Sequence, residues 1–283
     1  MRLCSPTEGN WSERTQAPTD GGCPQVDTTD VRPVGQVAAL YDIHGNLPAL
    51  EATLAALDAA RVERIVIGGD VVPGPMPRET LDRLLALGPR ARFLRGNGDR
   101  VVVDAFDGQP LTRWPPVIRE PIAWTARQLD RHHRDVLASL PETLVVNVEG
   151  LGPVLFCHAS PRSDEEIITA RTPAPRLRPM LEDVTQSVVV CGHTHMQFDR
   201  TVDAVRLINA GSVGMPYGRP GACWLLLGPD VRLMRTEYDL ERAAALVQET
   251  SYPQAAEFAS RHVMTPPTEE EALDLFEPMP LRT

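Results

Sequence analysis

The stretch Gln36-Val37-Ala38-Ala39-Leu40-Tyr41-Asp42-Ile43-His44-Gly45-Asn46 decides the fold, because in it an apolar run ends at an Asp-x-His turn. A short apolar run bounded by a turn is typical of a buried strand. Two more such runs follow, at 64–70 and 92–95, and helical spacing of leucines fills the intervals 47–60 and 79–87. The first hundred residues therefore predict alternating strands and helices, the pattern of an α/β protein.

The rest of the chain predicts mostly short strands. A Gly-containing turn between two β-rich runs predicts a hairpin at 144–148 and 154–156. Residues 100–140 form a predicted insertion over one edge of the sheet, in which 122–140 is one helix. Residues 161–180, rich in Arg and Pro, predict a surface loop. Further strands are expected at 187–191, 205–209, 222–227 and 231–235, and helices at 240–248 and 253–263.

Composition separates a domain from two tails. Residues 1–34 are rich in Thr, Gly, Pro and Asp and predict a flexible N-terminal extension. Residues 265–283 are rich in Pro and Glu and predict an acidic disordered tail. The domain itself is expected to span 35–264, and the tails are expected to be dispensable for catalysis.

Charge and cysteine content narrow the class of protein. Lys plus Arg is 28 and Asp plus Glu is 38, so the formal net charge is −10, which argues against a nucleic-acid scaffold. The five cysteines form no CxxC pair, and this favours a reducing cytoplasm. Since no run of 18 apolar residues occurs, we expect no membrane partner. Oligomeric state is left open.

Metal-type ligands follow five of the apolar runs, where strand ends of an α/β sheet place ligands. The candidates are Asp42, His44, Asp70, Asn97, His158, His193 and His195. A lone histidine at a strand end is more often structural, and Asp42 or Asn46 could simply cap the next helix. Seven N and O donors together suit two divalent ions that share a carboxylate, with Mn expected and Fe, Zn or Ni as alternatives.

With these motifs the sequence resembles the calcineurin-like metallophosphoesterase superfamily. The family pattern is Asp-x-His, Gly-Asp, Gly-Asn, a single His and Gly-His-x-His, and the resemblance covers about residues 36–263. The phrase at 208–214, Ile-Asn-Ala-Gly-Ser-Val-Gly, resembles the small bacterial phosphodiesterase-like branch. The resemblance implies two facing mixed β-sheets that form a sandwich flanked by helices in four layers, with metals at the strand ends.

The resemblance also implies a role for each ligand. Asp42, His44 and His195 would hold one metal, Asn97, His158 and His193 the other, and Asp70 would bridge them. The implied activity is hydrolysis of a phosphodiester or a small phosphorylated molecule by a hydroxide held between the metals, with Asp70, Asn97 and His158 as catalytic residues. Two adjacent cations acidify water and clamp the attacking and leaving oxygens.

One position departs from the family pattern. Gly98 stands where the family usually has a histidine that protonates the leaving group. We therefore expect hydrolysis rates that depend strongly on the pKa of the leaving group, and expect Gly98→His to weaken that dependence. His132 or His133 could replace the missing acid, but both are more readily interpreted as exposed helix residues.

Other residues near the motifs carry weaker signals. Of Arg162, Arg171, Arg176, Arg178 and Arg219, we favour Arg219 as a substrate-binding residue. Cys157 and Cys191 precede ligands on apolar strands and are interpreted as small core residues.

The alternative function is a non-catalytic, metal-bound interaction scaffold resembling the retromer subunit of the same fold. Gly98 and the acidic segment 269–276 favour it, whereas the intact ligand set favours the enzyme.

Overall fold

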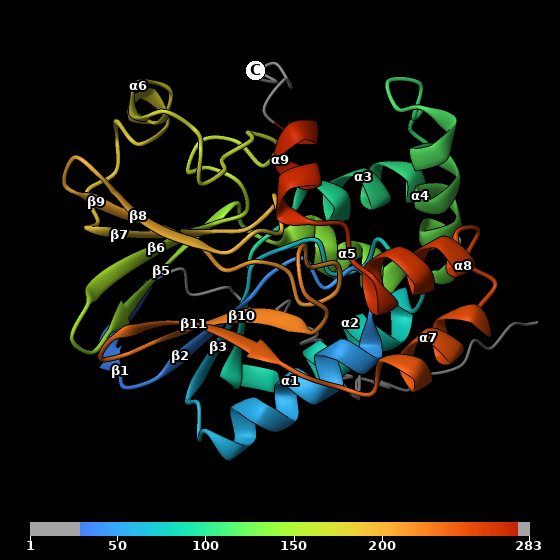
Figure 1. Cartoon of the computed structure of the whole chain (residues 1–283), viewed down its shortest axis with the longest axis horizontal. Coiled ribbons are helices and arrows are strands. Elements are labelled where there is room, and N and C mark those ends of the chain that lie inside the picture. The colour runs from blue at the N-terminus through green and yellow to red at the C-terminus, as the bar shows by residue number, and fades with distance from the viewer. Residues whose placement is uncertain (1–28, 277–283) are drawn as a thin grey trace, which may run out of the picture.

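The structure, a computed structural model, describes residues 29–276, with side chains from residue 32. Two mixed β-sheets face each other and helices cover them (Figure 1). The six-stranded sheet has the order β1 (Thr29–Val34), β5 (Thr143–Val148), β6 (Gly152–Cys157), β7 (Val188–Cys191), β9 (Val205–Asn209), β8 (Phe198–Val202). The five-stranded sheet has the order β11 (Val231–Thr236), β10 (Ala222–Leu227), β2 (Val37–Leu40), β3 (Arg64–Ile67), β4 (Ala91–Phe93). The expected sandwich is confirmed.

The two faces of β2 explain the layers. Val37, Ala39 and Tyr41 face the other sheet and pack in one core with Phe156 and Val190. The alternate residues of the strand pack against helices in a second core. Because both faces are apolar, the strand reads as a continuous apolar run, as buried parallel strands do. Tyr41 also donates from its hydroxyl to the Val190 carbonyl at 3.2 Å and so ties the sheets together.

Helices of the first half of the chain cover the five-stranded sheet. They are α1 (Leu47–Ala59), α2 (Pro77–Leu85), α3 (Asn97–Phe106), α4 (Pro116–Gln128) and α5 (Arg131–Ser139), with a 3₁₀ turn η1 (Gly88–Arg90) before β4. The side chain of Asn46 accepts from the Ala49 N–H at 3.2 Å and caps α1. The other face of the six-stranded sheet is covered by segment 161–184, which includes α6 (Ala174–Leu177) and η2 (Arg178–Met180).

The C-terminal part adds a smaller helical cluster beside α2 and α4. It consists of α7 (Leu240–Gln248), α8 (Ala255–Phe258) and the π-helical segment η3 (Ala259–Met264), whose apolar residues share one core. Helix α9 (Glu269–Phe276) follows along the chain. In α9, Phe276 packs edge-on against Tyr217, with the ring centres 6.1 Å apart (Figure 1 shows the helix). Among the described residues, no helix is long and apolar enough to cross a bilayer.

Four expectations need correction. The single helix 122–140 is two helices, because α4 starts earlier, with Pro121 inside it, and Asp130 caps α5 by accepting from the His133 N–H at 3.1 Å. Residues 29–34 form β1, parallel to β5, rather than a flexible extension. Residues 269–276 form α9 rather than disordered chain. Strand β8 lies where no strand was expected. The predictions for 1–28 and 277–283 fall outside the described residues.

Candidate metal centre

Six of the seven candidate ligands converge in two trios. One trio is Asp42, His44 and His195, and the other is Asp70, His158 and His193; within each, the possible ligand atoms lie within 4.8 Å of one another. The seventh candidate, Asn97, contacts the second trio through His158. The residues come from loops at the ends of β2, β3, β4, β6 and β7, so the sheets bring together segments far apart in sequence.

Two histidines of the first trio direct their Nε2 atoms at each other. His44 Nδ1 lies 3.0 Å from the Pro73 carbonyl, and His195 Nδ1 lies 2.9 Å from the Met215 carbonyl. A carbonyl can only accept, so each Nδ1 carries a proton, and each ring in its neutral form presents a lone pair at Nε2. These two nitrogens are 3.2 Å apart. Two facing lone pairs repel, and a cation between them removes the conflict.

Asp42 adds a buried carboxylate to the same point. Its Oδ2 accepts from the His193 N–H at 2.9 Å. Its Oδ1 lies 3.4 Å from His195 Nε2 and has no hydrogen-bond partner among the described residues. Burial acts to raise the pKa of Asp42, but His195 and His158 hold it below its usual range, so the group is ionised. A buried anion with a free oxygen is costly unless a cation pairs with it.

Asp70 belongs to the second trio and also lies close to the first. Its Oδ2 lies 3.8 Å from His44 Nε2, whereas its Oδ1 lies 3.6 Å from His158 Nε2. The Gly98 N–H donates to Oδ1 at 2.7 Å and fixes the carboxylate plane. One oxygen thus faces each trio, which is the arrangement a bridging ligand requires.

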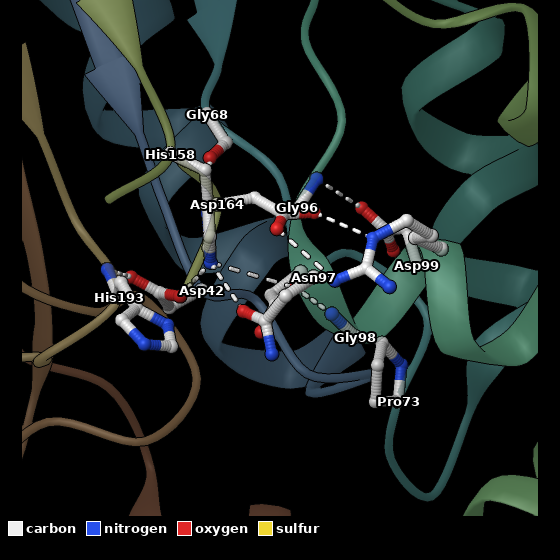
Figure 2. A network of polar contacts seen from close by, with 12 residues as sticks. Asp42, Gly68, Pro73, Gly96, Asn97, Gly98, Asp99, His158, Asp164 and His193 are labelled. Atoms are coloured by element: carbon white, nitrogen blue, oxygen red, sulfur yellow. Dashed lines mark hydrogen bonds and ion pairs between the residues drawn. The ribbon is translucent and has the colours of Figure 1, made fainter. Parts of the chain in front are cut away.

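The second trio has a similar conflict of acceptors (Figure 2). His158 Nδ1 lies 2.8 Å from the Gly68 carbonyl, while its Nε2 lies 3.0 Å from Asn97 Oδ1. Both partners are acceptors, so His158 can donate to both only when it is protonated; burial disfavours that form, but Asp70 and Asp42 favour it and raise the pKa of His158. The neutral ring that metal binding needs can donate to only one of them. Burial and the charge of His158 lower the pKa of His193 to about 4, which keeps that imidazole neutral, as metal binding needs. The residues therefore fit two divalent cations.

Backbone strain is concentrated at the same residues. Seven non-glycine residues in the described chain have a positive φ, and five are candidate ligands: Asp42, His44, Asp70, His193 and His195, with φ between 48° and 64°. Such conformations cost about 1–3 kcal/mol each and persist only where the surroundings enforce them. This clustering marks the trios as a functional site.

Residues 208–214 hold the turns 42–44 and 192–195, which carry the histidines, in place. The sequence did not reveal this role. Asn209 Nδ2 donates to the Gly192 carbonyl at 2.6 Å, and Asn209 Oδ1 accepts from the Gly211 N–H at 2.8 Å. Ser212 Oγ donates to the Asp42 carbonyl at 2.6 Å. The segment therefore supports both Asp42 and the Gly-His-x-His turn.

Asn209→Ala should lower the free energy of unfolding by about 1–3 kcal/mol, because it leaves the buried Gly211 N–H without its acceptor and removes one of the two donors to the Gly192 carbonyl. Urea unfolding of the variant and of the parent chain measures the difference. Gln248→Ala, at an exposed position on α7, is the control. A loss below about 0.5 kcal/mol for Asn209→Ala would contradict the supporting role.

Asp99 holds the loop that carries Pro73. Its Oδ1 accepts from the Val71 and Val72 N–H groups at 2.9 and 3.2 Å, and its Oδ2 accepts from the Gly96 N–H at 3.3 Å. Burial and the charge of Asp70 raise the pKa of Asp99 to about 7, while these backbone donors act in the opposite direction. Asp99 thus positions the loop that follows β3 next to the metal ligands.

His132 and His133 do not reach the trios. His132 is exposed, as expected, but His133 is buried, contrary to the expectation. His133 Nε2 lies 2.9 Å from Asp82, and its Nδ1 accepts from the Asp130 N–H at 3.3 Å. One ring nitrogen thus contacts the start of α5 and the other contacts α2, so His133 has a structural role.

None of the five arginines considered as substrate contacts lines the cavity that contains His44, Asp70 and Asn97. Arg219 is exposed and lines a hollow with Arg235 and Glu237 that contains none of the candidate ligands. Arg162 pairs with Glu166, and Arg178 with Asp203. Arg219 as a substrate contact remains a prediction. Cys157 and Cys191 are buried free thiols in the core.

A cavity of about 330 Å³ opens directly on the trios. His44, Asp70, Asn97 and Gly98 contribute to it from the metal side. On the other side it is lined by Trp114 and by residues of α4, with Met215, Tyr252 and Gln254 completing the lining. Neither α4 nor the 252–254 segment carries a motif that would identify a binding site from sequence.

The family model described as the calcineurin-like phosphoesterase superfamily domain matches residues 36–229. An uncharacterized protein of Methanocaldococcus jannaschii is 26% identical over 240 residues, which cover 77% of this chain and 94% of the relative.

Two solved structures share the fold. A metallophosphoesterase of Sphaerobacter thermophilus has a TM-score of 0.64 and 28% identity, covering 80% of this chain and 98% of that one. A hypothetical protein of Pyrococcus horikoshii has a TM-score of 0.70 and 22% identity, and the match covers 82% of this chain and 99% of that one. With the family model matching more than half of its length, the chain belongs to the calcineurin-like phosphoesterase superfamily.

Proposed function

We propose that the protein is a phosphodiesterase that hydrolyses a small phosphorylated molecule with two divalent metal ions. The observation that carries the proposal is Asp70, a member of the second trio, because one of its oxygens faces His158 of that trio and the other faces His44 of the first. Phosphoester hydrolysis at a two-metal site needs this arrangement, because both the attacking and the leaving oxygen require charge stabilisation.

Each residue then has a defined task. Asp42, His44 and His195 would hold one ion, Asn97, His158 and His193 the other, and Asp70 both. When bound, the two ions supply Lewis acidity, which acidifies water and stabilises charge on the phosphoryl oxygens. The chain fixes the ligand geometry: the Pro73, Met215 and Gly68 carbonyls set the histidine tautomers, and the Gly98 N–H orients Asp70.

The surroundings of the trios favour a diester over a monoester. No arginine is found among the described residues that line the cavity, and the chain contains no lysine. The second negative charge of a monoester would therefore have only the metals to compensate it. The apolar lining on the α4 side suits a second ester group instead.

The ligand atoms, the free cysteines and the net charge support the expectations on metal identity, compartment and partners. All seven candidate ligands offer N or O atoms, which suits Mn, with Fe, Zn or Ni as alternatives. The buried free cysteines Cys157, Cys191 and Cys223 agree with a reducing cytoplasm. The net charge of −10 disfavours a nucleic-acid scaffold.

Metal removal tests the proposal. The metal-free chain should not hydrolyse bis-p-nitrophenyl phosphate, and Mn²⁺ should restore turnover with two ions bound per chain. Metal analysis and release of p-nitrophenolate are measured on the same samples, with Zn²⁺, Fe²⁺ and Ni²⁺ in parallel. Two bound ions without turnover would favour the interaction scaffold, while a single bound ion would contradict the bridging role of Asp70.

A further inference from the structure

We propose that Trp114 and the first turns of α4 form a subsite for an uncharged aromatic group of the substrate, so that aryl phosphodiesters are the substrate class. The proposal deepens the proposed function and rests on it. The wall is defined as Val101, Trp114, Val117, Ile118, Pro121 and Ile122, which line the cavity opposite the trios.

The wall and the metal side share one cavity of a suitable size. Gly98 and Val101 lie one turn apart on α3 and both line it. Its volume of about 330 Å³ exceeds the ~150 Å³ that holds a benzene molecule in an apolar cavity. A phosphate at the trios can therefore direct an attached ring onto the wall.

Two residues of the wall are exposed although they are strongly apolar. Val117 is 60% exposed and Ile118 is 40% exposed. Adjacent exposed aliphatic side chains beside a polar centre mark a surface where an apolar ligand displaces water. Burying an aromatic ring there favours binding in proportion to the area removed from water.

Trp114 is held in a fixed orientation, and the nearby cation is already paired. The Arg113 guanidinium carbon lies 4.6 Å from the centre of the Trp114 ring. Arg113 also forms an ion pair with Glu165 at 2.9 Å. The cation therefore orients the indole rather than being left to bind a second phosphate.

The start of α4 is fixed by an unusual hydrogen bond. Pro121 lies inside the helix and has no N–H, so the carbonyl of Val117, four residues earlier, lacks its helical donor. Gln254 Nε2 donates to that carbonyl at 2.8 Å. On the same side, Tyr252 packs edge-on against Trp124, with the ring centres 5.3 Å apart. The wall is thus preformed, which lowers the cost of binding.

Charge selects which aromatic group fits. The wall carries no ionised side chain, and no arginine is found among the described lining residues. A neutral ring is favoured there, whereas a chain of further phosphates would be buried without a partner. This distinguishes an aryl ester from a nucleoside polyphosphate as the occupant.

Calorimetric titration of the Mn²⁺-loaded protein with phenylphosphonate and methylphosphonate tests the subsite. The two ligands present the same anion to the metals and differ only in the organic group. Phenylphosphonate should bind at least about tenfold tighter. Ile118→Asp and Trp114→Ala should reduce this ratio to near one, while Leu233→Ala, on the exposed face of β11, should preserve it.

Equal affinity for the two phosphonates, or an equal loss for both in Ile118→Asp, would overturn the subsite. A metal-independent measurement separates this from failure of the metal centre. In metal-free protein, p-cresol should give saturation-transfer NMR signals that Ile118→Asp abolishes. If the signals persist in that variant, the wall does not bind the ring; if they vanish while the Mn²⁺-loaded parent shows no turnover, only the catalytic proposal fails.

Discussion

Asp70→Asn should lower kcat/KM for bis-p-nitrophenyl phosphate by more than about 100-fold and should reduce the bound metal to at most one ion per chain. The amide keeps the shape of the carboxylate but removes its charge, and its nitrogen cannot ligate a cation. Loss of a residue that only orients a ligand costs about 10–100-fold. Loss of a group whose two oxygens face both trios should cost more.

Asp199→Asn is the matched control, because Asp199 forms an ion pair with Arg206 between β8 and β9, away from the trios. Its kinetics and metal content should equal those of the parent chain. Circular dichroism of both variants checks that the fold is retained. An Asp70→Asn variant with two bound ions and full turnover would show that the trios do not form a bridged site.

Much of the site could be predicted because the seven candidate ligands follow five apolar runs. The carboxyl ends of β2 and β3 meet at one edge of a parallel pair, so Asp42 and Asp70 had to lie close together. The spacing of His193 and His195 identified a further turn. The prediction that a second sheet faces the first rested on the family resemblance, because periodicity does not specify how sheets pack.

Elements that depend on distant partners escaped prediction. Strand β1 contains Asp, Arg and Pro and gains its conformation by pairing with β5, more than a hundred residues away. Helix α9 begins with three glutamates, but Ala272 is buried and Phe276 packs edge-on against Tyr217, which itself lies beside His195. Composition alone could not show these contacts, because tertiary packing overrides local propensity.

The residues that hold the ligand loops in place could not be predicted from the sequence either. Asn209 and Ser212 act through hydrogen bonds to backbone groups of other loops, and such pairing leaves no periodic signal. The apolar wall was missed for another reason: Val117 and Ile118 fall within a Pro-rich segment, and such composition predicts an irregular loop rather than a helix. The structure shows why the segment is a helix: Ile122 and Ala126 are buried in the core, and Gln254 donates to the Val117 carbonyl that Pro121 leaves without its helical donor.

Gly98→Ala should lower kcat/KM by about 10–100-fold, because the glycine provides space rather than backbone freedom. Its φ is not among the positive values, so an alanine could adopt the backbone conformation. A Cβ at this position, however, would lie 2.7 Å from Pro73 Cγ and 2.9 Å from Asp70 Oδ1. The added methyl group must displace Asp70 or the loop that sets the tautomer of His44.

The same crowding changes the expectation for Gly98→His. The imidazole cannot be added without moving Asp70, so the variant should lose activity with every leaving group instead of weakening the dependence on leaving-group pKa. In the parent chain that dependence should be steep. Among the described residues that line the cavity, the phenol of Tyr252 is a poor proton donor, since burial raises its pKa to about 12.

Aryl phosphodiesters whose leaving phenols have pKa values from ~7 to ~10 measure both effects, with log kcat plotted against leaving-group pKa. Gly108→Ala is the control: its φ of +76° strains an added side chain, but nothing lies within 4 Å of the new Cβ. It should lower stability and leave kcat/KM unchanged. A flat plot for the parent chain would mean that another group donates the proton. A shallower slope in an active Gly98→His variant would show that the imidazole fits beside Asp70 without disturbing it.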